Sequence, residues 1–252
     1  MIATDQTPAT ERVPMGSLRR TALVAGVLYL LTFVSIPTLG LYSAVRNDPS
    51  YVTGPGPDTP VLVGGILEVI VALAGVGTAV VLFPVLKRQN EGVALGFVGS
   101  RVLEGAGILS GVACLLSIVS LRQAGAGTGA LAAAQTLAIL YGRIFLLSQS
   151  LMPAVNDLLL GYLLYKSRLV PRILLWLAFI GAPLLLVSWS GVVFGLWGQR
   201  STLTPLAALP VALFEFSLGI YLVVKGFRPS PITAGIVATD GPSARQQLAA
   251  GR

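Results

Sequence analysis

Six charged side chains interrupt stretches of the sequence that are otherwise apolar. They are the acids Glu68, Glu104, Asp157 and Glu215 and the bases Arg101 and Arg143. Carboxylates of this kind can transfer protons, bind cations or stabilise positive charge in a reaction. A charged side chain at the centre of a membrane helix costs about 2.5–3.5 kcal/mol to insert. The six residues therefore indicate a polar centre whose cost in free energy is offset either by a function or by helix packing.

The residue types that are missing narrow the chemistry of such a centre. The 252-residue chain has no His and one Cys, Cys114. Zinc and haem sites, His-assisted nucleophiles and an intrachain disulfide are therefore not expected. The net charge is +7, but the basic residues punctuate apolar runs and form no patch, so nucleic acid is not an expected partner. We expect no metal and no cofactor, which leaves carboxylate chemistry.

The composition places the chain in a membrane. Hydrophobic residues make up 54% of it and charged residues 11%, whereas soluble proteins carry about 25% charged residues. Segments of about 20 apolar residues can span a bilayer as helices. Six segments qualify: 21–42, 60–86, 93–121, 147–165, 172–197 and 205–225. The predicted fold class is an all-α, polytopic transmembrane helix bundle.

The remaining segments complete the predicted domain organisation. Residues 130–145 have a further helical pattern, which we interpret as a re-entrant or interfacial helix beside the fourth span. The transmembrane domain is expected over residues 18–228, with mobile cytoplasmic tails at 1–17 and 229–252. The first apolar run is long and lacks a clear cleavage site, so we expect a retained helix.

The distribution of Lys and Arg predicts the orientation of the spans, because cytoplasmic loops are enriched in both. Nine basic residues fall in loops or flanks on one side: Arg19, Arg20, Lys87, Arg88, Lys166, Arg168, Arg172, Lys225 and Arg228. The opposite loops hold Arg46, Arg122 and Arg200. Both termini are therefore predicted to be cytoplasmic, in a cell membrane. Abundant Ala, Gly and Leu suggest a bacterial source.

Helical periodicity indicates where the charged residues point. Glu104 shares a helix face with small residues such as Gly107 and Gly111, and each of the other acids lies on a similar stripe. Small residues mark helix–helix contacts in membranes, so the acids are expected to face protein. Arg101 and Glu104 are three residues apart and can pair within one helix.

These faces predict one buried polar centre whose role is not assigned. Its members are Arg101, Glu104, Asn156, Glu215, Glu68, Asp157 and Arg143. Glu68 is the member most easily explained by packing alone. Four carboxylates against two guanidiniums leave a formal charge of −2. Protons, a bound cation, a cationic ligand or an aqueous cavity could balance that charge.

Four stretches of the sequence stand out together: GGILEVIVALAGVGTAVVLFPVLKRQNEG, FVGSRVLEG, VNDLLLGYLLYKSRLVPR and FEFSLGIYLVVKGF. In combination they resemble the bacterial membrane family called domain of unknown function 4386. The resemblance covers residues 18–230 and implies a multi-pass helical protein without implying an activity. The positions that match the family's recurrent polar residues are Glu68, Arg101, Glu104, Asn156 and Glu215; Asp157 departs from that pattern.

Three classes of function remain open. The protein could bind or move a small solute or proton through the acidic centre. It could be a structural or partner-binding subunit without chemistry, or a metal-free intramembrane enzyme acting on a lipid-soluble, terpenoid-like substrate. The expected partners are accordingly the lipid bilayer and a small solute, a proton or a lipid-soluble ligand. The sequence does not determine the oligomeric state.

Overall fold

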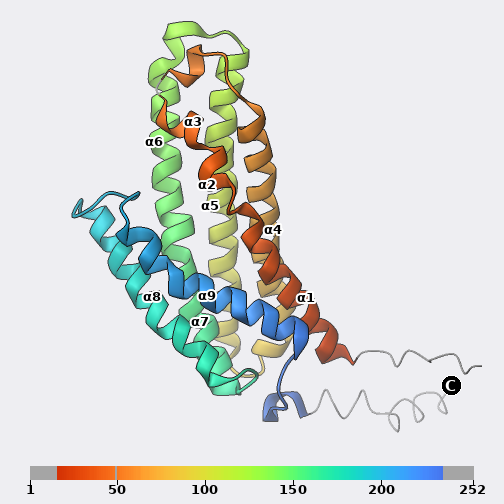
Figure 1. Ribbon diagram of the computed structural model, residues 1–252. Helices are drawn as coiled ribbons and strands as arrows, with labels where there is room; N and C mark the ends of the chain where they lie inside the picture. Colours follow the sequence, from red (N-terminus) through yellow and green to blue (C-terminus); the bar gives the residue numbers. More distant parts are fainter. Residues whose placement is uncertain (1–15, 49, 235–252) are drawn as a thin grey trace, which may run out of the picture.

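A computed structural model of the protein describes residues 16–48 and 50–234, and every regular element in them is a helix (Figure 1). The predicted tails at 1–17 and 229–252 lie for the most part outside these residues. The long helices are α1 (Ser17–Leu31), α4 (Thr59–Leu86), α5 (Glu91–Gln123), α6 (Leu131–Phe145), α7 (Met152–Ser167), α8 (Arg172–Val193) and α9 (Leu203–Val224). Short elements are η1 (Thr32–Ser35), α2 (Thr38–Leu41), α3 (Ser43–Asn47), η2 (Tyr51–Thr53), η3 (Gly127–Ala130) and η5 (Pro231–Thr233).

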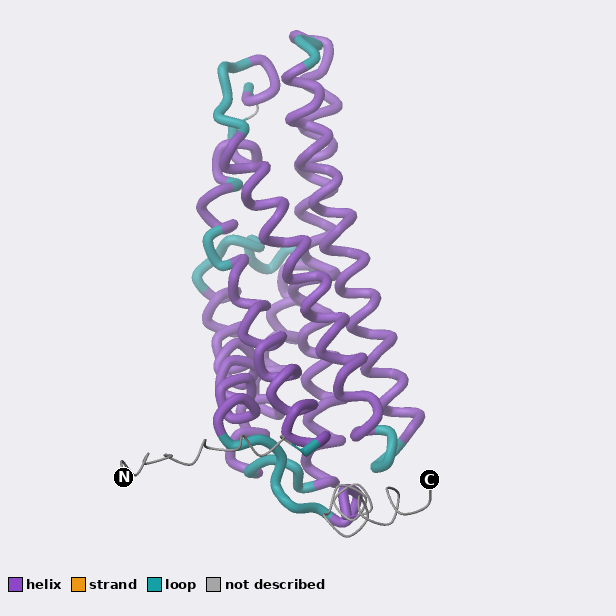
Figure 2. The backbone as a smooth tube through the Cα atoms, turned by 90° about the vertical axis from the view of Figure 1, so that its right-hand side faces the viewer, coloured by secondary structure: helices purple, strands orange, loops and turns teal. Residues whose placement is uncertain are grey.

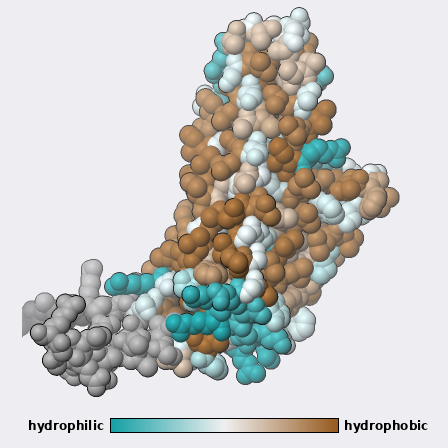
Figure 3. Space-filling model, turned by 180° about the vertical axis from the view of Figure 1, so that it is seen from behind, coloured by the Kyte–Doolittle hydropathy of each residue, from teal (hydrophilic) through white to brown (hydrophobic). Residues whose placement is uncertain are grey.

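Six helical segments are long and apolar enough to cross a membrane, which confirms the prediction of a multi-pass helical protein. They are Ser17–Leu41, Thr59–Leu86, Glu91–Gln123, Gly127–Ser167, Arg172–Val193 and Leu203–Val224. Their outward surfaces carry exposed apolar side chains such as Leu73, Leu103 and Val187. Figure 3 shows this apolar surface as a broad brown band above a hydrophilic end.

The predicted helix at 130–145 is not separate from the fourth span. α6 continues through a π-helical segment, Leu146–Leu151, directly into α7, and the chain does not turn back between them (Figure 1). Figure 2 shows the long helices of the bundle and the loops that join them. Pro153 has no N–H to donate to the carbonyl of Gln149, and the helix widens here instead of ending. Residues 130–145 are therefore part of one continuous helical segment, Gly127–Ser167, and a re-entrant or interfacial position of this part stays a prediction.

The first span, by contrast, is interrupted. α1 ends at Leu31, and the chain passes through η1 and Pro37 before it resumes as the short helix α2. Two hydroxyls bond carbonyls close to this break. Thr32 donates to the carbonyl of Tyr29 at 2.6 Å, and Thr38 donates to that of Ser35 at 2.7 Å. Bonds of this kind keep an irregular segment viable within an apolar span.

Six of the helices form a closed ring. α1 packs against α4, α4 against α5, α5 against α7, α7 against α8, α8 against α9, and α9 against α1 (Figure 1). The half of this ring nearer the start of α1 is filled by apolar side chains, among them Leu82, Phe97, Leu160, Phe214 and Leu218. The ring therefore surrounds a space that a hydrophobic core closes at this end.

Glycines set the closest contacts of the ring. A Cβ at Gly26 of α1 would lie 2.7 Å from the carbonyl oxygen of Gly219 in α9. A Cβ at Gly181 of α8 would lie 2.8 Å from the backbone nitrogen of Val211. Both positions exclude a side chain, so α9 lies almost in backbone contact with its two neighbours.

The two ends of the bundle differ in charge. At one end, Arg19 donates to the carbonyl of Leu222 at 2.9 Å, and the N–H of Arg228 donates to the carbonyl of Leu169 at 2.8 Å. These bonds bring the start of α1, the α7–α8 turn and the end of α9 together. Lys87 and Arg88 of the predicted cytoplasmic side lie at the α4–α5 turn, and Arg88 donates to the carbonyl of Ile232, beyond the end of α9.

At the opposite end, α4, α5 and α6 extend beyond the α8–α9 connection (Figure 1). Arg122 pairs there with Asp58, through a bond from Nε to Oδ1 of 2.7 Å and a contact between Nη2 and Oδ2. Tyr51 donates to the same carboxylate at 2.9 Å. The bonds from Arg122 are the main reason that the pKa of Asp58 falls to about 2. This network ties the α3–α4 loop to the end of α5.

We expect Gly26→Val to destabilise the bundle, because its side chain would meet the backbone of α9. Overpacking of this kind costs about 1–3 kcal/mol. Gly99→Val, on α5, is the matched control, since a Cβ there meets no heavy atom within 4 Å. Thermal unfolding in detergent measures both variants. Equal melting temperatures for the two would contradict the close α1–α9 contact.

Candidate functional site

The centre of the site is Arg101, which α5 buries inside the ring. The side chain of Arg101 is 3% exposed. Its Nη1 donates to Oε2 of Glu104 at 2.9 Å, one turn further along the same helix. The pairing that the spacing of these residues predicts is therefore present, and α5 alone supplies it.

Arg101 also reaches two other helices. Its Nη2 donates to Oε1 of Glu215 in α9 at 2.5 Å and lies 3.3 Å from the hydroxyl oxygen of Tyr29 in α1. The guanidinium stands over the Tyr29 ring, 5.4 Å from its centroid. One buried cation thus joins α1, α5 and α9.

α7 contributes the next member. Asn156 is fully buried, and its Nδ2 donates to Oε2 of Glu104 at 2.7 Å. The same oxygen accepts from Arg101, so one carboxylate oxygen holds α5 and α7 together. The predicted convergence of Arg101, Glu104, Asn156 and Glu215 is present in the structure. These four residues are the polar cluster.

Asp157 lies beside the polar cluster but forms no bond with it. It follows Asn156 in α7 and is fully buried, and neither carboxylate oxygen has a hydrogen-bond partner within the described residues. Asn156 Oδ1 and Arg101 Nε are likewise without partners there. A buried, unpartnered polar group is costly to a fold, so these atoms are retained against a stability cost.

Glu68, in the first half of α4, belongs to a different cluster, which it forms with Tyr141 and Gln149. The hydroxyl of Tyr141 donates to its Oε1 at 3.4 Å, and Nε2 of Gln149 donates to the same oxygen at 3.5 Å. Glu68 itself is buried and bonds none of the four residues of the polar cluster. The sequence pattern placed it on an inward face but did not reveal this separation.

The structure places Arg143, a predicted member of the buried polar centre, on the surface of the bundle. Its side chain is exposed on the surface of α6. The helix that carries it continues without a break into α7, so the face is fixed by the helical register. Tyr141, two residues earlier, is buried instead and takes the inward position beside Glu68.

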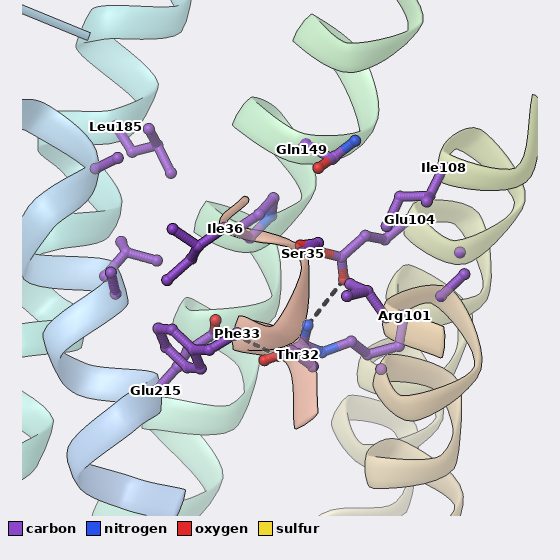
Figure 4. A pocket seen from close by; sticks show the side chains of 18 residues that line it. Thr32, Phe33, Ser35, Ile36, Arg101, Glu104, Ile108, Gln149, Leu185 and Glu215 are labelled. Carbon is purple, nitrogen blue, oxygen red and sulfur yellow. Dashed lines mark hydrogen bonds and ion pairs between the residues drawn. The ribbon is translucent and has the colours of Figure 1, made fainter. Parts of the chain in front are cut away.

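A cavity of about 270 Å³ opens onto the polar cluster. Each of the six candidate spans contributes to its wall (Figure 4). Arg101, Glu104 and Glu215 line it, together with Gln149 from the π-helical segment and Phe33 from η1. Asn156, the fourth member of the polar cluster, bonds Glu104 but is not part of the cavity wall. The side chains of Glu104 and Glu215 are 11% and 13% exposed, whereas that of Arg101 is 3% exposed.

The cavity reaches the surface of the protein where the first span is interrupted. Ile36, which follows η1, lines the cavity and is 58% exposed. The wall on the α9 side is apolar and includes Ala208, Val211 and Ala212. The cavity therefore has an apolar mouth and a polar floor, and the hydrophobic core of the ring closes it below.

Two contributing residues are not among the predicted members of the polar centre. Tyr29 contributes a hydroxyl that Arg101 contacts, and Gln149 lies between the cavity and Glu68. Gln149 is four residues before Pro153, which was a usable signal. Tyr29 gave none, because a tyrosine in an apolar helix is commonly a packing residue.

Comparison with known proteins assigns the family. The sequence model described as "Domain of unknown function (DUF4386)" matches residues 24–226, so the chain belongs to this family of unknown function. No curated protein and no solved structure matches the chain. The described residues contain no group of three or more His, Cys, Asp or Glu side chains that could hold a metal ion.

We expect Arg101→Gln to lower the free energy of unfolding by about 3–5 kcal/mol, because two carboxylates would lose their buried partner. The triple variant Arg101→Gln, Glu104→Gln, Glu215→Gln should recover much of that loss, since it removes the unpaired charges. Thermal unfolding in detergent between pH 5 and 8 measures both. Arg143→Gln, on the exposed face of α6, is the control. A triple variant no more stable than the single one would contradict the ion-pair account.

Proposed function

We propose that this protein binds a small cationic or hydrogen-bond-donating ligand inside the membrane, in the cavity above Arg101. The observation that carries the proposal is the charge of the cavity floor. Arg101 supplies one positive charge there against the carboxylates of Glu104 and Glu215. Both carboxylates keep some exposure to the cavity, whereas the guanidinium is almost fully covered. A ligand in the cavity therefore meets a net negative surface.

The size and shape of the cavity limit the ligand further. Its volume of about 270 Å³ lies just below the range of about 300–1,000 Å³ that is usual for drug-sized ligands. The mouth is apolar and lies at the interrupted first span. A small amine with a short apolar portion fits both parts of the cavity. Its ammonium group faces the carboxylates of the floor, and its apolar part faces the apolar wall on the α9 side.

The alternatives fit the geometry less well. An enzyme that acts by acid catalysis needs a carboxyl group that is free to give its proton to a substrate, but Glu104 and Glu215 are both held by hydrogen bonds from Arg101. A purely structural centre would be more stable if protein covered its charged groups completely, yet these carboxylates face an open cavity. Binding, with transport of the ligand or of a proton as its extension, is the best-supported function.

Cysteine accessibility tests the proposal and does not require the ligand to be identified. In a Cys114→Ser background, Ala212→Cys places a thiol on the cavity wall, and Leu218→Cys places one in the closed core as the control. We expect the cavity thiol to react faster with a cationic ethylammonium methanethiosulfonate than with an anionic sulfonate analogue. Added n-propylammonium should slow the reaction, and n-propanol should not.

Glu215→Gln should reduce the preference for the cationic reagent, because it removes one of the two negative charges facing the ligand. An unreactive thiol at position 212 would favour the structural-subunit alternative. Equal rates with the two reagents, or no effect of n-propylammonium, would exclude a cation-binding cavity.

The same proposal includes an orientation: both termini lie in the cytoplasm of a bacterial cell, and the cavity mouth faces the outer half of the plasma membrane. The clustering of Lys and Arg at one end of the bundle supports it. A fluorescent protein fused after Arg252 should then fluoresce, and alkaline phosphatase at that position should be inactive. Phosphatase fused instead within the α8–α9 connection, after Gly198, should be active. The reverse pattern would overturn the orientation.

A further inference from the structure

A second pocket lies at the outer end of the bundle, away from the polar cluster. It has a volume of about 180 Å³ and is lined by Leu39, Ser43, Arg46, Asn47 and Arg200. Three elements meet there: α2, α3 and the α8–α9 connection. Arg200 donates through Nη1 to the side-chain oxygen of Asn47, which fixes the two sides of the pocket relative to each other.

The two arginines of this pocket have no acidic partner. Among residues 16–48 and 50–234, no carboxylate forms an ion pair with Arg46 or Arg200. Arg46 is held instead by aromatic rings: its guanidinium carbon stands 5.0 Å from the centroid of Tyr141 and 5.9 Å from that of Phe145. Such stacking orients a guanidinium and leaves its N–H groups available to a ligand.

The nearest acids are engaged elsewhere. Asp48 accepts from the backbone N–H of Ser50 at 2.9 Å and from its hydroxyl at 2.6 Å. Glu68 lies on the far side of Tyr141, whose hydroxyl donates to it at 3.4 Å. Neither carboxylate therefore neutralises the pocket from within.

The electrostatics of Arg46 reflect this arrangement. Burial lowers the pKa of its guanidinium, and the nearby Arg200 lowers it further, against the opposing influence of Tyr141, Glu68 and Tyr42. Two cations that share a small pocket repel each other, and an anion between them would relieve that repulsion.

We propose that this pocket binds the phosphate group of a phosphate ester or of free phosphate, between Arg46 and Arg200. Guanidinium groups match phosphate oxygens in geometry and charge, and Ser43 and Asn47 can add polar contacts. Leu39, at the rim, is 67% exposed and belongs to the end of the first candidate span. That position allows an acyl chain to continue from the phosphate, so a lipid headgroup and inorganic phosphate are both sources of the same chemistry. This site is independent of the cavity above the polar cluster.

Two titrations test the proposal and separate the sources. Purified protein in a phosphate-free maltoside detergent is titrated with inorganic phosphate against chloride at equal ionic strength, and separately with short-chain phosphatidylglycerol. Thermal stability reports binding in each case. We expect Arg46→Gln and Arg200→Gln each to weaken the response about tenfold, because each removes one charge-assisted contact. Arg143→Gln, an exposed arginine outside the pocket, should respond like the wild type.

Each outcome supports or overturns the proposal. A response to inorganic phosphate alone identifies a free anion as the ligand, and a response to phosphatidylglycerol, with or without one to phosphate, identifies a lipid headgroup. No response to either probe overturns the proposal. So does a response that Arg143→Gln reduces as strongly as Arg200→Gln, since that would show unspecific surface charge. Arg200 is exposed, so its variant remains informative even if Arg46→Gln fails to fold.

Discussion

The structure depends on one buried guanidinium. Arg101 lies between a carboxylate on its own helix and a carboxylate on α9, and it also contacts the hydroxyl of Tyr29 on α1. A cation in this position is tolerable only while both carboxylates stay close, so it fixes the angle and depth at which three helices meet. Asn156 extends the constraint to α7 through Glu104. The other contacts of the ring are mainly apolar and small-residue packing, which is less directional.

That constraint also explains why a cavity persists. The glycine contacts bring α9 into near backbone contact with α1 and α8, and the first span is interrupted at η1, whose residues line the cavity. Space therefore opens directly above the polar cluster, and below it the apolar core closes the ring. A membrane helix bundle of this size could instead fill its interior with leucine, so the polar floor and the space above it are features that packing alone does not require.

The two proposed sites use charge in opposite ways. Within the bundle, one arginine faces two carboxylates, and the exposed part of the cluster is acidic. At the end of the bundle that holds the α8–α9 connection, two arginines share a pocket without an acidic partner among the described residues. Tyr141 and Gln149 of the π-helical segment lie between these regions, and both donate to the carboxylate of Glu68. A cationic ligand in the cavity and an anionic group in the arginine pocket are thus chemically distinct and can be tested separately.

By itself the sequence determined the class of structure, because apolar runs of about 20 residues have few alternatives to membrane helices. It also predicted that Arg101 and Glu104 pair, because helical geometry brings residues three apart together. Inward faces could also be read from small-residue stripes. Only the tertiary structure decided which inward residues meet. Glu215 reaches Arg101 while Glu68 does not, because depth along the membrane depends on helix tilt and on the break at η1, neither of which local periodicity encodes. The same holds for α6: it continues through the π-helical segment into α7, and in this continuous helix Arg143 is exposed and Tyr141 is buried.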